Sequence, residues 1–287
     1  MRLAQRLAAA AVVALTPASY LTAQNAGKNL AMDFRVTTSI QGIKDTMVMT
    51  GHAVGSGDKM RIDVTSTGTN SQISPLTSTG PVSMVITDTG KTITYIDAKK
   101  NQYLRVRPVE MVQQAQAMGG MKMDFSGTTT KVDSVGPGPS ILGHPTSHYR
   151  VGTAMTMTMS AMGQQQSIQF STTGDYFYAT DLKGALNPFV SLSGSDMVTM
   201  FGASNKDFAE KMKAMQEKLP KGTPLRASTS TTIVSQGATR VTNSRAEVTA
   251  VQLVNADPKA FEIPPTYTLA PAPGMGDTGT GSTIPPR

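Results

Sequence analysis

Apolar and polar residues alternate along most of the chain from Leu30 onward. Because successive side chains of a strand point to opposite faces, a period of two predicts strands with one buried face. The apolar positions of the first three predicted strands are Met32, Phe34, Val36, Met47, Met49, Met60, Ile62 and Val64. A Gly-rich turn at Gly55–Asp58 leads into the third of them.

Short turns separate the next three apolar runs, at Met84–Ile86, Thr92–Ile96 and Tyr103–Val106. Short connections of this kind predict an antiparallel meander. Longer strands are predicted at Thr128–Val135, Ser147–Met159, Ser167–Tyr178, Leu225–Val234 and Thr239–Leu253. Phe261–Pro265 is predicted to be a closing edge segment.

Two segments have helical patterns. Val109–Met118 is rich in Ala and Gln and is followed by two glycines, which predicts a short helix. Ser204–Leu219 begins with a residue that can cap free backbone N–H groups. Its apolar residues Phe208, Met212, Met215 and Leu219 recur at helical spacing. We therefore predict an amphipathic helix that packs on the sheet or covers it as a lid.

The first 23 residues have the order of a secretory signal peptide. Arg2 and Arg6 precede an apolar run at Leu7–Leu15, and Ala23 is a small residue ahead of a plausible cleavage point. The run is about half of the roughly 20 residues that a membrane-spanning helix needs. We expect residues 1–23 to be removed, 24–269 to form one β domain, and the Pro-, Gly- and Thr-rich tail 270–287 to be disordered.

Composition excludes several classes of site. The chain has no Cys, so thiolate nucleophiles, Cys-based zinc sites and a lipidated Cys anchor are absent. Only 16% of residues are charged, below the usual quarter, which is typical of an exported β protein. The formal net charge of +7 falls to +5 when Arg2 and Arg6 are lost, and the remaining Lys and Arg are scattered. Nucleic acid is therefore not an expected partner.

No catalytic motif is complete. His144 and His148 are four residues apart, but the neighbouring Gly143 and Pro145 favour a turn entering a strand over a helical metal site. Ser56 and Lys59 have the spacing of some acylating hydrolases, yet the accompanying signatures are missing and a glycine turn explains them. The sequence favours a protein that is not an enzyme and needs no cofactor.

Methionine is unusually frequent, with 19 residues, and Met155, Met157 and Met159 must share one face of a strand. Three interpretations remain open. The methionines fill an irregular core, they line an adaptable apolar cavity, or they bind Cu(I) through their thioethers. One strand alone cannot bring three thioethers to one ion, because same-face residues are about 6.5 to 7 Å apart.

The order of several short motifs resembles exported bacterial proteins of unknown function that have the fold of the outer-membrane lipoprotein carriers. The motifs are Lys91–Asp97 followed by Lys100 and Tyr103, Ile141–His144 leading to His148–Val151, Lys221–Leu225, Glu247–Val251 and the ending Phe261–Tyr267. They span about Leu30 to Leu269. The resemblance implies a mainly β fold, a single curved antiparallel half-barrel with a few helices on its concave face. The alternating runs predict about nine to twelve strands in this sheet. It also implies an apolar concavity that binds or transfers a ligand.

We therefore expect a periplasmic or secreted, non-enzymatic protein that binds an apolar or amphiphilic, lipid-like ligand on the concave face. Its mature chain is expected to have no transmembrane segment. The expected ligand-binding residues are Met155, Met157, Met159, Phe208, Met212 and Met215. The alternatives are a Met-rich periplasmic Cu(I)-binding protein and an interaction protein of the cell envelope without a small ligand, whose partner is another envelope protein.

Overall fold

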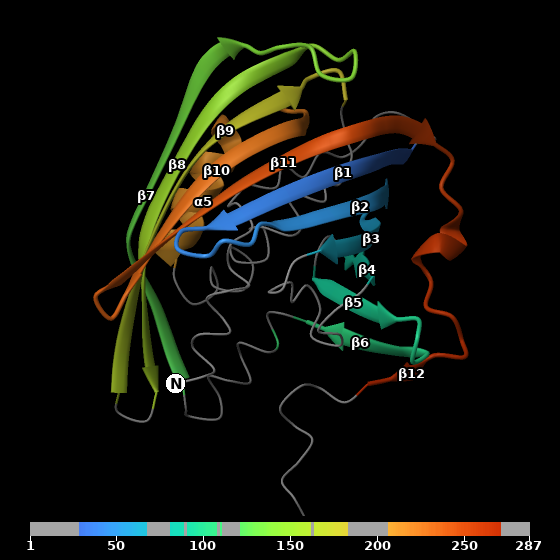
Figure 1. Cartoon of the computed structure of the whole chain (residues 1–287), viewed down its shortest axis with the longest axis horizontal. Coiled ribbons are helices and arrows are strands. Elements are labelled where there is room, and N and C mark those ends of the chain that lie inside the picture. Colours follow the sequence, from blue (N-terminus) through green and yellow to red (C-terminus); the bar gives the residue numbers. More distant parts are fainter. Residues whose placement is uncertain are drawn as a thin grey trace, which may run out of the picture.

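All twelve strands in the described part of the chain belong to one open sheet (Figure 1). The computed structural model describes residues 29–67, 81–88, 91–107, 110, 121–161, 164–182 and 206–270. The strands are β1 (Asn29–Ile40), β2 (Met47–Ser56), β3 (Lys59–Thr67), β4 (Val82–Thr87), β5 (Thr92–Asp97), β6 (Gln102–Val106), β7 (Met121–Pro137), β8 (Thr146–Ala161), β9 (Gln164–Ala179), β10 (Thr223–Ser235), β11 (Ala238–Val254) and β12 (Thr268–Leu269). The predicted fold class is confirmed.

The sheet order is β12-β6-β5-β4-β3-β2-β1-β11-β10-β9-β8-β7. Neighbours in sequence are neighbours in space within each half, as expected for strands joined by hairpins. The two halves meet where β1 pairs with β11 along its full length, from Asn29 opposite Val254 to Ile40 opposite Thr242. Every pair is antiparallel except β12 with β6.

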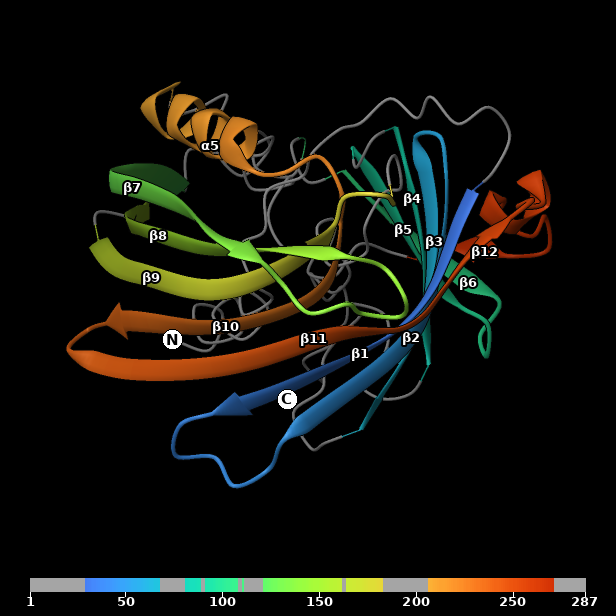
Figure 2. The ribbon, with the colours of Figure 1, turned by 90° about the horizontal axis from the view of Figure 1, so that it is seen from above.

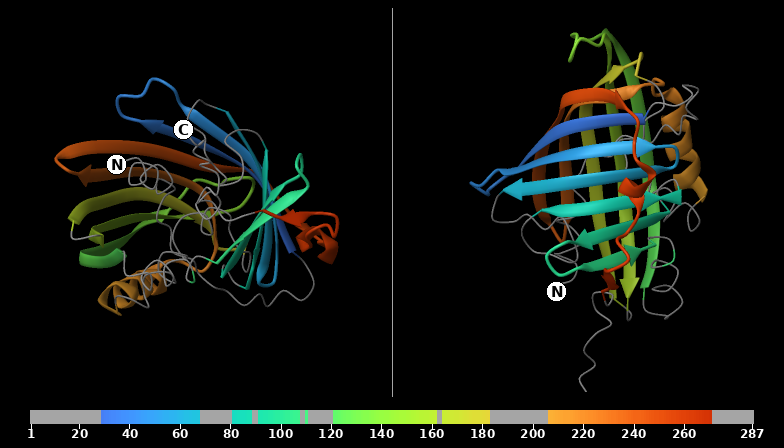
Figure 3. Two further views of the ribbon diagram at one scale, coloured as in Figure 1. Left: turned by 90° about the horizontal axis from the view of Figure 1, so that it is seen from below. Right: turned by 90° about the vertical axis from the view of Figure 1, so that its right-hand side faces the viewer.

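Irregular positions bend the sheet. The register shifts between Ser126 and Thr129 and between Ser134 and Gly136 in β7, with further shifts in β1–β11 and β9–β10. Gly127 and Gly136 have positive φ angles of 62° and 126°, as bulges of this kind require. From above, the sheet curls into an open curve with β7 at one end (Figure 2). From the side, β1–β6 cross steeply in front of β7–β9 (Figure 3).

The inner face of this curve carries the largest group of buried residues. We define it as the face that bears Phe34 and Val36 of β1 and the residues in register with them on the other strands. Alternation in β1, β3 and β4 supplies most of the core, as the sequence pattern predicts. Its members include Met32, Phe34, Val36, Met49, Met60, Ile62, Val64, Val82, Met84, Ile86, Leu225 and Val248.

The C-terminal segment packs on the outer face. A 3₁₀ helix at Pro258–Phe261 places Phe261 against Val85 and Ile96, and Arg61 donates a hydrogen bond to the Ala260 carbonyl oxygen at 3.2 Å. The prediction of an edge segment at Phe261–Pro265 is wrong, since the edge strand is β12. Two consecutive prolines lack N–H donors, so the chain turns there before it can pair with β6.

The helix α5 (Lys206–Lys218) confirms most of the predicted helix at Ser204–Leu219. Its first two predicted residues lie outside the described residues, as do the expected signal peptide 1–23, the expected tail 270–287 after residue 270, and all of the predicted helix Val109–Met118 except Glu110.

Gly51 tests the inner-face packing. A Cβ built at Gly51 meets the Phe34 ring and lies 2.9 Å from the Asp63 carbonyl oxygen, whereas a Cβ at Gly152 meets nothing closer than 3.9 Å. We expect Gly51→Ala to lower the free energy of unfolding by about 1 to 3 kcal/mol through overpacking, and Gly152→Ala to change it by less than about 0.5 kcal/mol. Urea unfolding followed by far-UV circular dichroism measures both, and equal stabilities would contradict this packing.

Candidate functional site

Helix α5 lies against the inner face at the β7 end of the sheet (Figures 1 and 2). Its apolar side joins residues from β7, β8, β9 and β10 in a group that we call the α5 cluster. The buried members of the cluster are Phe125, Val151, Met155, Tyr176, Tyr178, Phe208, Met212, Met215, Leu219 and Ala227.

The three helix residues predicted from the sequence lie at the centre of this cluster. Phe208, Met212 and Met215 are 0%, 2% and 1% exposed. The Phe208 ring stacks on Phe125, with ring centroids 4.9 Å apart and an interplanar angle of 27°. The three side chains are therefore buried against the sheet.

The three methionines of β8 are divided between two environments. Met155 is buried in the α5 cluster, and Met157 is partly buried and packs against it. Met159 is half-buried and lies outside the cluster as the described residues define it. The structure thus brings five of the six expected residues together and leaves Met159 at the margin.

The register of β8 shows what surrounds Met155 and Met157. Met155 is opposite Phe170, and Met157 lies between Phe125 and Ile168. These neighbours have no metal-binding atoms. In the described part of the chain, no group of three or more His, Asp or Glu residues is placed to hold a metal ion. The packing of Met155 and Met157 is that of core or cavity residues.

Sequence reasoning missed the aromatic half of the cluster. Tyr176 and Tyr178 are two apart on β9, and the alternating pattern placed them on a common face without showing what they would meet. Their ring centroids are 6.4 Å apart. The Tyr149 ring meets the Tyr178 ring edge-on, with the centroids 6.0 Å apart. Burial raises the pKa of both phenols, so they stay protonated at neutral pH.

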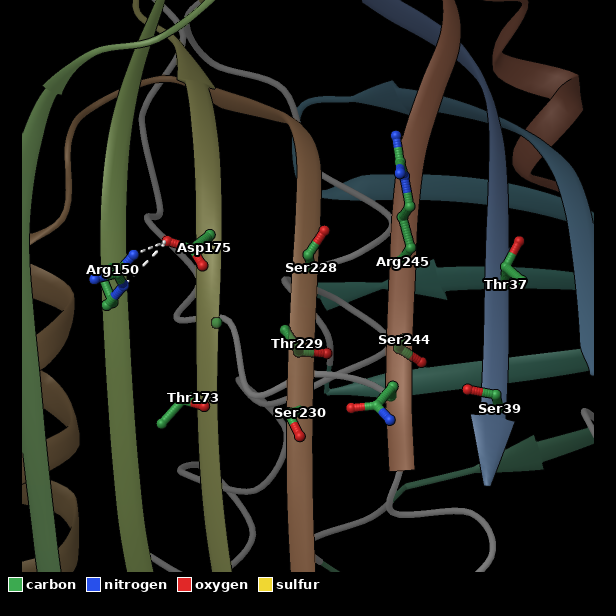
Figure 4. A pocket seen from close by; sticks show the side chains of 12 residues that line it. Thr37, Ser39, Arg150, Thr173, Asp175, Ser228, Thr229, Ser230, Ser244 and Arg245 are labelled. Carbon is green, nitrogen blue, oxygen red and sulfur yellow. Dashed lines mark hydrogen bonds and ion pairs between the residues drawn. The ribbon is translucent and has the colours of Figure 1, made fainter. Parts of the chain in front are cut away.

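The outer face carries most of the charge near the centre of the sheet. A shallow groove of about 690 Å³ crosses β1, β11, β10, β9 and β8 there, with Arg150, Asp175 and Arg245 among serine and threonine side chains (Figure 4). Asp175 is 2.8 Å from His148 Nε2 and 3.1 Å from Arg150 Nη2. Glu247 is 2.7 Å from Arg245 Nη2.

These outer carboxylates are poor proton carriers at neutral pH. Partial burial works to raise the pKa of Asp175, but hydrogen bonds from His148 and Arg150 outweigh it and hold that pKa below its usual value. The hydrogen bond from Arg245 lowers the pKa of Glu247 in the same way. Both carboxylates therefore remain ionised within ion pairs, as on a solvated surface.

The other motifs lie in a hairpin turn and in ion pairs. Ser56 and Lys59 are opposite one another at the β2–β3 hairpin, where Gly57 has a φ angle of 60°, so the expected turn is confirmed. His144 and His148 bind different partners, because Nδ1 of His144 is 2.7 Å from Asp181 while His148 contacts Asp175. No helix within the described residues is long and apolar enough to span a membrane.

Comparisons with known proteins give little more. No family model matches the chain, and neither does a curated protein. Among solved structures it is similar to the crystal structure of a domain described as an outer membrane lipoprotein-sorting protein from Vibrio parahaemolyticus. That similarity covers 91% of this chain and 94% of that chain, at 6% identity and a TM-score of 0.29. A similarity with so low a TM-score assigns neither a family nor a function.

Removing the Phe208 ring should loosen α5. Truncation of a buried Phe costs about 3 to 5 kcal/mol, and cleavage of a helix by a protease follows the population of its open form. We expect trypsin to cut Phe208→Ala at Lys211, Lys213 or Lys218 at least about tenfold faster than the wild type. Glu217→Ala, at an exposed position of the same helix, should be cut at the wild-type rate. Equal cleavage of all three proteins would show that Phe208 does not hold α5 in place.

Proposed function

We propose that this chain is an exported, non-enzymatic binding protein that holds an apolar or amphiphilic, lipid-like ligand on the inner face of its curved sheet. Helix α5 is the cover of this site, and the ligand takes its place. The domain at residues 24–269 performs this role after removal of residues 1–23, in the periplasm or outside the cell.

The observation that carries the proposal is how α5 is attached. One side of a 13-residue helix packs on the inner face, chiefly at the edge strand β7, while Lys213, Glu217 and Lys218 face solvent. Beneath it the sheet is apolar, with Val151, Met155 and Ala227. A helix held on one side at the end of a sheet can move away without breaking any strand pairing.

The state with α5 packed on the sheet and the state with ligand in its place have comparable energies. Each buried Phe, Leu or Met side chain of α5 contributes about 1.5 to 3 kcal/mol, and each CH₂ group of a ligand buried in its place contributes about 0.8 kcal/mol. An acyl chain of roughly eight to fifteen carbons therefore offsets the contacts of Phe208, Met212, Met215 and Leu219. The flexible methionines Met155, Met157 and Met159 adapt to such a chain better than branched residues do.

Copper is the weaker candidate. Cu(I) binding needs several thioethers or imidazoles to converge, and Met155 and Met157 are instead surrounded by Phe125, Ile168 and Phe170. An envelope interaction protein without a small ligand is the remaining alternative, and the experiment below separates it from the proposal.

Native mass spectrometry of the protein purified from its own cell envelope tests the proposal. We expect retained lipid, with a mass that dissociates as one or more acyl-containing molecules. Retained copper would support the metal-binding alternative, and a protein that carries neither would support the interaction protein.

A matched variant makes the same experiment more specific. Replacing Met155, Met157 and Met159 together by Leu should preserve folding and change lipid retention only modestly, because Leu and Met have similar volumes. Under the copper alternative, this triple variant would lose stoichiometric Cu(I) binding in competition with a colorimetric chelator. A tight wild-type copper complex that disappears in the variant would contradict the proposed function.

A further inference from the structure

Five threonines form a continuous row across the inner face. Each lies directly opposite the next on the neighbouring strand, from β7 to β11, at the usual inter-strand spacing of about 4.8 Å. The members of this threonine ladder are Thr130, Thr153, Thr172, Thr231 and Thr242.

Four members of the ladder are buried and Thr130 is half-buried, and only part of the ladder is hydrogen-bonded. Thr172 and Thr231 share a hydrogen bond of 3.0 Å between their hydroxyl oxygens. The hydroxyls of Thr153 and Thr242, at 5% and 1% exposed, have no hydrogen-bond partner in the structure as described. Thr128, which the β7 bulge turns inward beside the ladder, is 3% exposed and equally unpartnered.

Two of these hydroxyls belong to the region that α5 covers. Thr153 lies between Val151 and Met155, both in the α5 cluster, and Thr128 is three residues from Phe125 of the same cluster. The Tyr178 hydroxyl is a third buried, unpartnered group there within the described residues. A buried hydroxyl without a partner loses its hydration and gains nothing in return. Valine has the same shape and would avoid that cost, so packing alone does not account for these threonines.

The surroundings restrict what could bind these hydroxyls. Among the described side chains of β7 to β10, every residue in register with the ladder's face is uncharged. Arg240 of β11 is opposite Ile233 and so shares that face, and it is exposed near the β10–β11 hairpin. Within the described strands β7 to β10, a charged headgroup would find no counter-ion on the ladder's face. Uncharged acceptors such as carbonyl oxygens would accept hydrogen bonds from them.

We propose that Thr128 and Thr153 hydrogen-bond the ester carbonyl oxygens of an acylated amphiphile whose chains occupy the apolar surface vacated by α5. This inference rests on the proposed function and names the class of ligand: molecules with acyl ester linkages, whether free lipids or the acyl groups of a lipidated partner. When α5 lies on the sheet, the two hydroxyls have no hydrogen-bond partner. When the ligand replaces α5, its ester carbonyl oxygens accept hydrogen bonds from them. Thr128 and Thr153 therefore favour the ligand-bound state.

The test compares two lipids that differ only in the proposed contact. Short-chain diacyl phosphatidylcholine and its dialkyl ether analogue, both monomeric and without net charge, are titrated against the full chain by calorimetry. We expect the wild type to bind the ester lipid roughly tenfold more tightly than the ether lipid, as two hydrogen bonds allow. The double variant Thr128→Val, Thr153→Val should bind both lipids with the wild-type affinity for the ether, and should unfold at the same or higher urea concentration.

Thr173→Val is the matched control, because Thr173 is exposed on the outer face of β9 and should leave the ester preference unchanged. Equal binding of the two lipids by the wild type would overturn the inference and leave the proposed function standing. An ester preference that persists in the double variant would overturn it as well. A wild type that binds neither lipid would contradict both the inference and the proposed function.

Discussion

The pairing of β1 with β11 is the constraint on which the rest of the structure depends. It joins the first described strand to the last long one, and so makes one sheet from a half that runs from β1 to β6 and a half that runs from β11 back to β7. Without it, each half would present a long open edge. The two halves turn their apolar faces toward each other because a single twisted sheet with bulges in β7, β10 and β11 must curl.

That curl gives the inner face two regions with different properties. On β1 to β4 the apolar side chains pack mainly with one another and form a core. On β7 to β10 they pack against one short helix and contain a row of hydroxyls. A core built only for stability has little use for the unpaired hydroxyls of Thr128, Thr153 and Tyr178. The outer face, where ion pairs such as Arg150–Asp175 are solvated, has the ordinary character of a protein surface.

Local sequence patterns predicted the strands well. They could not predict contacts that depend on pairing between strands far apart in the sequence. The alternation at Met32, Phe34 and Val36 indicated a strand and its buried face, and the spacing of Phe208, Met212 and Met215 indicated the packed side of α5. The contact of Phe208 with Phe125 depends on which strand lies at the edge, information that no short window contains. The sequence did not predict the threonine ladder for the same reason, since Thr153, Thr172 and Thr231 become neighbours only through the register of the paired strands. The edge strand was misplaced because Pro264 and Pro265 redirect the chain before Thr268 pairs with β6.

In the proposed function, ligand and α5 compete for one surface, and hydrogen–deuterium exchange of the full chain measures this competition most directly. With a saturating monomeric diacyl lipid, the amides of Lys206–Lys218 should exchange faster than in the free protein, because the helix leaves the sheet and loses its packing. Exchange in the paired strands β1 and β11 should stay the same, since no strand separates. A lipid that binds while the exchange of α5 is unchanged or slower would contradict the account.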